Sequence, residues 1–91
     1  MLVPKQALET PPLEIQTLGA EALRQSARRI GKVNDQVREL ARDMLRSMYT
    51  AKGIGLAAPQ VAVYQQLLVI DLDLENAATP PLVLINPEIT A

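Results

Sequence analysis

The stretch GIGLAAPQVAVYQQLLVIDL, residues 53–72, is where the chain changes from a helical to an extended hydrophobic pattern. Two glycines flank Ile54, and Pro59 and Gln60 precede a run of aliphatic residues. Glycine has no Cβ atom, so another main chain can closely approach the N–H and C=O groups of these glycines. Proline favours extended backbone at the residue before it. The stretch therefore predicts a tight turn that leads into β structure and holds Gln60 on a rigid, non-helical segment.

The residues before this stretch predict one amphipathic helix. Asn34 is a suitable N-cap, and Asp35 stands where the helix dipole favours negative charge. Apolar residues then recur with the helical spacing i, i+3, i+4, i+7, i+8 and i+11, namely Val37, Leu40, Ala41, Met44, Leu45 and Met48. The two methionines suit either an adaptable binding surface or a core, and their spacing favours the core.

Two short β-prone runs follow the glycine-rich turn, LLVID at residues 67–71 and LVLIN at residues 82–86. The segment DLENAATPP between them has the composition of a loop. Earlier in the chain, residues 20–30 predict a short helical turn that Gly31 ends. Together these elements predict an α+β fold, in which a long amphipathic helix packs on short, mainly antiparallel strands.

The domain organisation follows from proline content and chain length. Residues 1–17 contain three prolines and predict an extended N-terminal arm, and residues 18–91 form a single domain or a portion of one. The apolar strands of the second half have little sequence left to cover them. We therefore expect an exposed apolar edge or face, which indicates a missing partner segment, subunit or domain.

The composition argues against several classes of function. Without cysteine or histidine, the chain has no disulfides and lacks the usual zinc and iron ligand sets. No apolar run approaches the roughly 20 residues that span a bilayer, and the N-terminus is unlike a signal peptide, so we expect a cytoplasmic protein without a membrane partner. Residues 24–52 carry eight basic residues against three acidic ones, but the charges are interleaved and lack neighbouring aromatics. They predict a solvated helix face rather than nucleic-acid binding.

One acidic cluster, Asp71, Asp73 and Glu75, has the D-x-D-x-E spacing that begins a calcium loop. Such a loop would need a glycine in place of Asn76 and a carboxylate in place of Leu82. The cluster therefore predicts the solvent-exposed face of a strand end.

Three interpretations of GIGLAAPQ differ in their chemistry. As G-x-G-x-x-A it matches a dinucleotide fingerprint, but a helix precedes it and a strand follows, which is the reverse of what that motif requires. As a docking edge, Gly53 and Gly55 would pair with a peptide, Ile54 would add an apolar wall, and the Gln60 amide would donate to a carbonyl oxygen that gains negative charge. Residue types alone favour the third and simplest interpretation, a turn into an edge strand with Gln60 on the surface.

At this point the sequence resembles a known family. GIGLAAPQV, residues 53–61, is similar to the first signature of the peptide deformylases, as are the flanking LRQSARRI, DMLRSMYTAKGIG, LLVIDL and PLVLINPEI, and the resemblance runs from about Leu13 to Ile89. It implies hydrolytic removal of the formyl group from the N-terminal formylmethionine of nascent polypeptides. It also implies that Gln60 is a catalytic residue that stabilises the formyl oxygen, and that Ile54 and Gly55 bind the substrate.

The resemblance also shows what this sequence lacks. Peptide deformylases hold iron or zinc through a cysteine of an E-G-C-L-S segment and two histidines of an H-E-x-x-H helix, and neither segment occurs in these 91 residues. The chain resembles the N-terminal half of such an enzyme, offers no metal ligands of its own, and is expected to be inactive alone. A smaller departure is Ala62, which stands where the family commonly has glycine.

Two hypotheses follow from this deficit. In the first, the chain is part of a peptide deformylase that acts on nascent formylated peptides once its C-terminal half is supplied. In the second, it is a non-catalytic interaction module derived from a deformylase, which self-associates or binds a larger partner through its open sheet.

Overall fold

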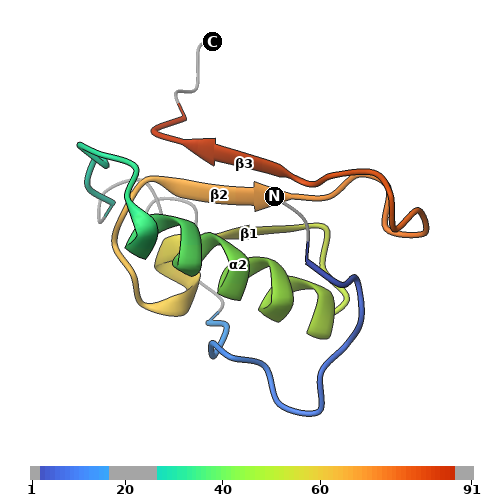
Figure 1. Cartoon of the computed structure of the whole chain (residues 1–91). Helices are drawn as coiled ribbons and strands as arrows, with labels where there is room; N and C mark the ends of the chain where they lie inside the picture. Colours follow the sequence, from blue (N-terminus) through green and yellow to red (C-terminus); the bar gives the residue numbers. More distant parts are fainter. Residues whose placement is uncertain (1–2, 17–26, 88–91) are drawn as a thin grey trace, which may run out of the picture.

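The computed structural model describes residues 3–16 and 27–87. In chain order its elements are helix α2 (Asp35–Thr50), strand β1 (Gly55–Ala57), the 3₁₀ helix η1 (Ala58–Val61), strand β2 (Leu67–Ile70) and strand β3 (Leu82–Ile85) (Figure 1). The predicted α+β fold and the antiparallel arrangement of its strands are confirmed. The helical turn predicted at residues 20–30 lies mostly outside the described residues, and residues 27–30 are not helical.

Helix α2 begins and ends with defined caps. The Asn34 Oδ1 atom accepts a hydrogen bond from the Val37 N–H at 3.0 Å, which confirms the predicted N-cap. At the other end, Lys52 N–H donates to Tyr49 O and Gly53 N–H donates to Met48 O, the bond pattern of a Schellman motif. Lys52 takes the left-handed conformation of this motif, with φ of 59°. The chain thereby reverses sharply at Gly53 and enters β1.

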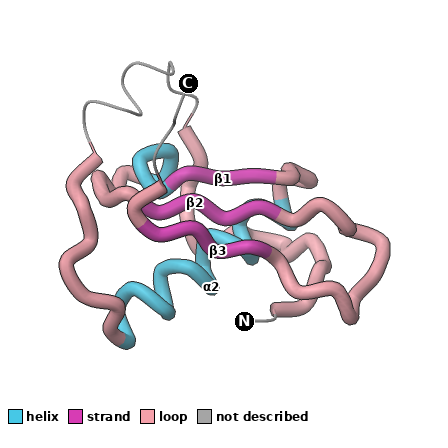
Figure 2. Tube along the Cα trace, turned by 90° about the horizontal axis from the view of Figure 1, so that it is seen from above, coloured by secondary structure: helices cyan, strands magenta, loops and turns pink. Residues whose placement is uncertain are grey.

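The three strands form one sheet in the order β1, β2, β3 (Figure 2). One face of the sheet packs on α2. The side chains that form this core are each less than a tenth exposed: Val37, Ala41, Met44, Leu45 and Met48 from the helix, and Leu56, Leu67 and Val69 from the sheet. Met44 and Met48 are 0% and 1% exposed, so the methionines belong to the core, as the helical spacing predicted.

The opposite face of the sheet is apolar and open within the described residues. The strand register places Leu82 beside Ile70 and Leu84 beside Leu68, all on the face that does not contribute to the α2 core. Leu82 is 51% exposed and Leu84 is 36% exposed. The expected uncovered apolar face is therefore present in the part of the chain that the structure describes.

The N-terminal segment, residues 3–16, contains no helix or strand but is fixed to the body of the molecule. It runs beside the second half of α2, where Leu8 N–H donates to Thr50 Oγ1 and Leu13 N–H donates to Ser47 Oγ, both at 3.1 Å (Figure 1). Val3 is buried. The assignment of residues 1–17 as an extended arm stays a prediction, and the division of the chain near residue 17 lies outside the described residues.

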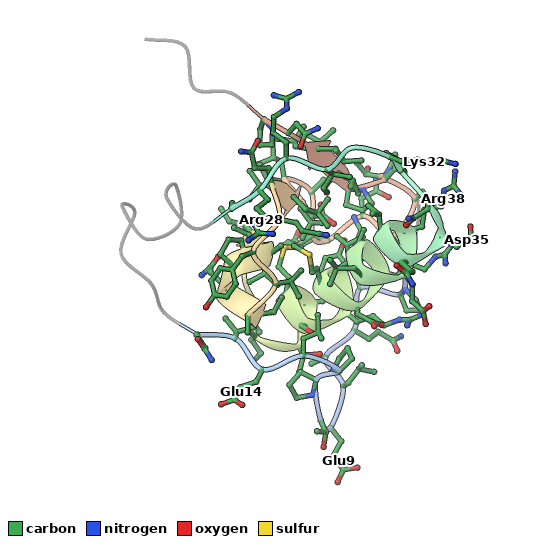
Figure 3. The ribbon with its side chains drawn as sticks, turned by 90° about the vertical axis from the view of Figure 1, so that its left-hand side faces the viewer. Glu9, Glu14, Arg28, Lys32, Asp35 and Arg38 are labelled. Carbon is green, nitrogen blue, oxygen red and sulfur yellow. The ribbon has the colours of Figure 1, made fainter. Side chains whose placement is uncertain are left out.

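The charged residues of α2 lie on its outer face. Arg38 pairs with Asp35 at 3.0 Å and Arg46 pairs with Asp43 at 3.3 Å, each one turn apart on the helix. Figure 3 shows Asp35 and Arg38 close together at the beginning of the helix. This arrangement is the solvated helix face that the interleaved charges predicted. Among residues 3–16 and 27–87, no helix has the length and apolar character that crossing a bilayer requires.

One prediction about the acidic cluster is wrong. Asp73 and Glu75 are exposed, but Asp71 is only 1% exposed. Its carboxylate lies 2.9 Å from the Lys5 ammonium group and accepts a hydrogen bond from the Tyr49 hydroxyl at 2.6 Å. The partners that make burial of this charge favourable come from distant parts of the chain, which the local D-x-D-x-E spacing does not reveal.

Candidate functional site

The main chain of Gly55 faces the open edge of the sheet. Ile54 O accepts a hydrogen bond from Asp71 N–H at 2.8 Å, and Leu56 lies opposite Val69 in the antiparallel register. Bonding groups alternate between the two sides of an antiparallel strand. The N–H and C=O of Gly55, between Ile54 and Leu56, therefore point away from β2 and are oriented to pair with an added strand.

The glycine at position 55 is not required by packing within the chain. Its φ is not positive, and an added Cβ atom would meet Val69 O at 3.7 Å and Ile70 Cγ1 at 3.9 Å, which are ordinary contacts. The fold would thus tolerate a side chain here. An external main chain that approaches this edge closely would explain the glycine. Ile54, its neighbour, is 60% exposed and presents an apolar side chain at the same end of β1.

Gln60 lies in η1, so the expectation of a non-helical segment is wrong in its local detail. Pro59 occupies the first turn of this short 3₁₀ helix, a position that does not need its missing N–H. The helix ends at Ala62, which has a φ of 63°. Left-handed backbone favours glycine, which explains why glycine is common at this position in the family that the sequence resembles. This chain has Ala62 there instead.

The amide of Gln60 is held in one orientation. Its Oε1 atom accepts a hydrogen bond from Ala57 N–H at 3.0 Å, and its main-chain O accepts from Gln16 N–H at 2.6 Å. Because an N–H group can donate only to the oxygen of the amide, Nε2 must point to the other side. No described residue accepts a hydrogen bond from Gln60 Nε2. Within residues 3–16 and 27–87, the two N–H donors of this side chain are thus unused.

Gln60 and Gly55 meet at one edge. By the strand alternation, the Ala57 N–H that binds Gln60 Oε1 points away from β2, in the same direction as the main-chain groups of Gly55. The structure therefore brings the carboxamide of Gln60 to the same edge of β1 as the exposed glycine. We call Ile54, Gly55 and Gln60 the β1 edge site. The sequence analysis selected all three residues as candidates but did not predict the bond from Ala57 that orients the amide.

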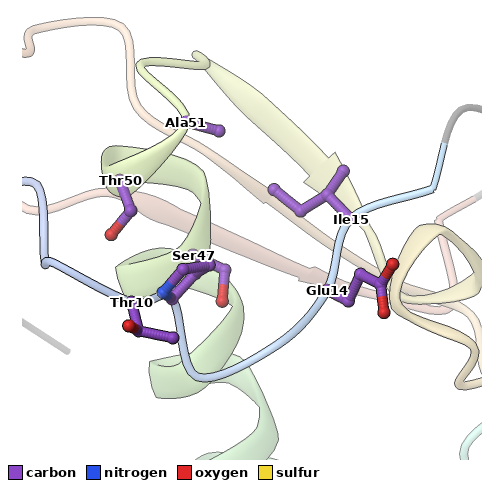
Figure 4. A pocket seen from close by; sticks show the side chains of 7 residues that line it. Thr10, Glu14, Ile15, Ser47, Thr50 and Ala51 are labelled. Atoms are coloured by element: carbon purple, nitrogen blue, oxygen red, sulfur yellow. The ribbon is translucent and has the colours of Figure 1, made fainter.

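A separate cavity lies away from this site. It has a volume of about 400 Å³ between the N-terminal segment and the end of α2, and it is lined by Thr10, Pro11, Glu14, Ile15, Ser47, Thr50 and Ala51 (Figure 4). None of the residues of the β1 edge site lines it. Two of its hydroxyl groups, those of Ser47 and Thr50, already bind the main chain of the N-terminal segment.

The structure thus combines an α+β fold, an open strand edge at Gly55 and an oriented carboxamide at Gln60. The family model of polypeptide deformylase matches residues 12–91, and this chain belongs to that family. It is 94% identical over 91 residues to a peptide deformylase of Synechococcus sp. strain CC9902, and 71% identical over 87 residues to peptide deformylase 2 of Prochlorococcus marinus strain MIT 9313. The family resemblance drawn from the GIGLAAPQV signature is confirmed.

Solved structures agree with this assignment. A peptide deformylase from Synechococcus elongatus, solved in complex with actinonin, matches with a TM-score of 0.90 and 52% identity over all of this chain and 50% of that one. The enzyme from Legionella pneumophila matches with a TM-score of 0.73 and 37% identity over 87% of this chain and 46% of that one. The chain spans about half the length of the curated relatives it matches, 45% in the case of the CC9902 protein.

Family membership implies a metal cofactor, but the residues of this chain do not fit one. The sequence has no histidine or cysteine, and the described residues contain no cluster of three potential ligand side chains. The buried carboxylate, Asp71, already uses both oxygens, Oδ2 with Lys5 and Tyr49 and Oδ1 with the Asp73 N–H. A ligand set of the family's kind would have to come from residues that this sequence does not contain.

Proposed function

We propose that this chain supplies the substrate-docking edge of a peptide deformylase, which hydrolyses the formyl group from the N-terminal formylmethionine of nascent polypeptides. In this role the main chain of Gly55 pairs with the backbone of the substrate, Ile54 contacts the methionine side chain, and Gln60 Nε2 donates to the formyl oxygen. The observation that carries the proposal is the bond from Ala57 N–H to Gln60 Oε1, because it holds the carboxamide at the edge at which Gly55 is exposed and leaves Nε2 outside this bond.

The Gln60 amide would act mainly in the transition state. When water adds to the formyl carbon and gives up a proton, the C=O bond becomes a single bond and its oxygen gains negative charge. The C–N bond then breaks as the nitrogen takes up a proton, which releases formate and the free amine of methionine. A fixed N–H donor binds the charged oxygen more strongly than the neutral carbonyl, so it lowers the barrier rather than only holding the substrate. One such donor contributes about 3–4 kcal/mol.

The complete reaction needs groups beyond these 91 residues. We propose that the family's metal is iron or zinc and that its ligands lie outside this sequence, so the chain alone binds substrate but does not turn it over. The apolar face that carries Leu82 and Leu84 would then be available to pack against the rest of the enzyme. We place the reaction in the cytoplasm, where formylated chains are made.

Binding of a formylated peptide to the chain tests the proposal directly. We expect formyl-Met-Ala-Ala to shift the NMR resonances of the Gly55 main-chain amide and the Gln60 side-chain amide, since both are proposed to bond to it. The same peptide with a free N-terminus lacks the formyl oxygen and should leave the Gln60 amide unshifted. If neither amide of the edge site responds at millimolar peptide, the proposed role of the β1 edge is wrong.

The second candidate function is an interaction module, and the exposure of Leu82 and Leu84 on the open face favours it. In this case the chain would pair with a copy of itself or with a larger partner through the sheet. Sedimentation velocity over a wide concentration range distinguishes the two functions. A dimer that forms in the micromolar range supports the module, whereas a cooperatively folded monomer at all concentrations argues against it.

A further inference from the structure

The Lys5 ammonium group is enclosed by oxygen atoms. Its Nζ atom lies 2.9 Å from Asp71 Oδ2 and donates to Asp73 O at 2.8 Å and to Asn76 O at 2.7 Å. The side chain of Lys5 is only 5% exposed. An ammonium group has three N–H donors and no acceptor. All three donors are therefore used. We call the three acceptors, Asp71 Oδ2, Asp73 O and Asn76 O, the oxygen cage of Lys5.

Asp71 connects this cage to the beginning of β1. Its side chain accepts hydrogen bonds from Tyr49 at 2.6 Å and from the Asp73 N–H at 2.8 Å, while its own main-chain N–H donates to Ile54 O at 2.8 Å. This last bond joins the incoming chain, immediately before Gly55, to the residue that follows β2. The position of Asp71 thus determines where the β1 edge site begins.

The charge state of the cluster is set by its surroundings. Desolvation opposes ionisation of Asp71, but the hydrogen bonds from Tyr49, Lys5 and Asp73 and the charge of Lys5 outweigh it and hold the pKa of Asp71 below its usual value of 3.8. Burial, with the hydrogen bond to Asp71 and its negative charge, raises the pKa of Tyr49. At neutral pH a carboxylate therefore faces a cation and a neutral phenol.

We propose that Lys5 is a positioning residue for the β1 edge site. Its ammonium ion fixes the Asp71 carboxylate and the carbonyls of the following loop, and the Asp71 N–H in turn fixes Ile54 O and the main chain of Gly55. The N-terminal segment thereby acts as a strap that sets the docking edge from the far end of the sequence. The assignment of this edge to substrate rests on the proposed function, whereas the mechanical link from Lys5 to Ile54 does not.

Hydrogen exchange in the 91-residue chain tests this link without an activity assay. In Lys5→Met, which keeps an unbranched side chain of similar length and removes the charge, we expect the Asp71 amide to exchange at least about tenfold faster. The Ile54 and Gly55 resonances should shift, while the amides between β2 and β3 keep their wild-type protection. Lys32→Met is the matched control, since Lys32 is exposed and lies before α2. It should change none of these amides.

Chemical rescue distinguishes an oxygen cage from a general charge effect. In Lys5→Ala, added ethylammonium should restore the protection of the Asp71 amide, because it supplies the same N–H donors. Tetramethylammonium has the same charge but no donors and should not. Lys5→Arg keeps the positive charge. We expect it to accelerate hydrogen exchange less than Lys5→Ala does, and only at the Asp71 amide.

Each contrary result has a defined meaning. Unchanged exchange at Asp71 in Lys5→Met, or equal acceleration at every amide, overturns the positioning role, and equal rescue by both cations overturns the cage. These outcomes leave the proposed function standing, because that depends on whether the wild-type chain binds formyl-Met-Ala-Ala. In support of the inference, Lys5→Met should weaken that peptide's binding severalfold, whereas Lys32→Met should not.

Discussion

Replacement of Asp71 by alanine is expected to destabilise the chain by about 3–5 kcal/mol, the usual cost of removing one partner from a buried ion pair. The substitution leaves the Lys5 ammonium group, whose side chain is 5% exposed, without a counter-ion, and it leaves the Tyr49 hydroxyl without its acceptor. It also creates space beside a packed core. Since domains of this size have stabilities near the lower end of about 5–15 kcal/mol, most of the native state would be lost. Urea unfolding followed by circular dichroism measures the change.

Glu75→Ala provides the matched control for this substitution. Glu75 belongs to the same acidic cluster but is exposed, so its removal should change the stability by no more than about 0.5 kcal/mol. If Asp71→Ala and Glu75→Ala have the same small effect, Asp71 does not hold the cluster together. Asp71→Asn keeps the shape and an acceptor for Tyr49 and should fall between the two.

The same carboxylate predicts how stability depends on pH. The pKa of Asp71 in the folded chain lies below its usual value of 3.8, so the ionised group contributes stability above that value. This contribution is lost as the pH falls through the lower, folded-state pKa, because the unfolded chain then binds more protons than the folded chain. Urea midpoints measured from about pH 7 to about pH 2 should fall more steeply for the wild type than for Asp71→Asn. Parallel curves would contradict the assignment.

The helix and the strands could be predicted from the sequence because their signals are local. The Asn34 cap lies three residues before the N–H that it binds, and the apolar stripe of α2 repeats with every turn. The β-prone runs at residues 67–71 and 82–86 coincide with β2 and β3 to within one residue. Strand β1 is only three residues long, too short to show a period of its own.

The cluster around Asp71 could not be predicted from the sequence. Asp71 is buried because Lys5 reaches it from 66 positions earlier, and Tyr49 from 22 positions earlier. A local sequence pattern contains only the neighbouring acidic residues Asp73 and Glu75, which are exposed, so it predicts an exposed Asp71 as well. For the same reason the prolines at the start of the chain predicted an extended arm but not the bonds that its main chain makes to Ser47 and Thr50 of α2.

The candidate site was predicted in part. The glycines and Gln60 were selected for their chemistry, and the structure places Gly55 and Gln60 at one edge of β1. Sequence reasoning missed that Gln60 caps its own turn through Ala57. A glutamine three residues after the start of a short helix is the signal that would have revealed this bond, since side chains at that position reach back to the N-cap N–H.

That cap makes a clean test of the proposed catalytic role possible, because the proposal gives the two ends of the Gln60 amide different tasks. In the full-length enzyme that carries this segment, Gln60→Glu should lower kcat by about 10²–10³, the usual cost of losing one oxyanion donor. The glutamate still offers an oxygen to the Ala57 N–H, so the stability of the fold should be unchanged. Steady-state kinetics with a formyl-Met peptide and thermal unfolding of the same samples measure both quantities.

Two further variants separate the donor from the cap. Gln60→Ala removes both and should reduce kcat similarly, but with an added stability loss of about 0.5–1.5 kcal/mol for the hydrogen bond to Ala57. Gln36→Glu makes the same chemical change at an exposed position of α2 and should leave kcat as it was. If Gln60→Glu keeps kcat within about threefold of the wild type, the donor contributes less than about 1 kcal/mol to the barrier, and Gln60 serves only to cap η1.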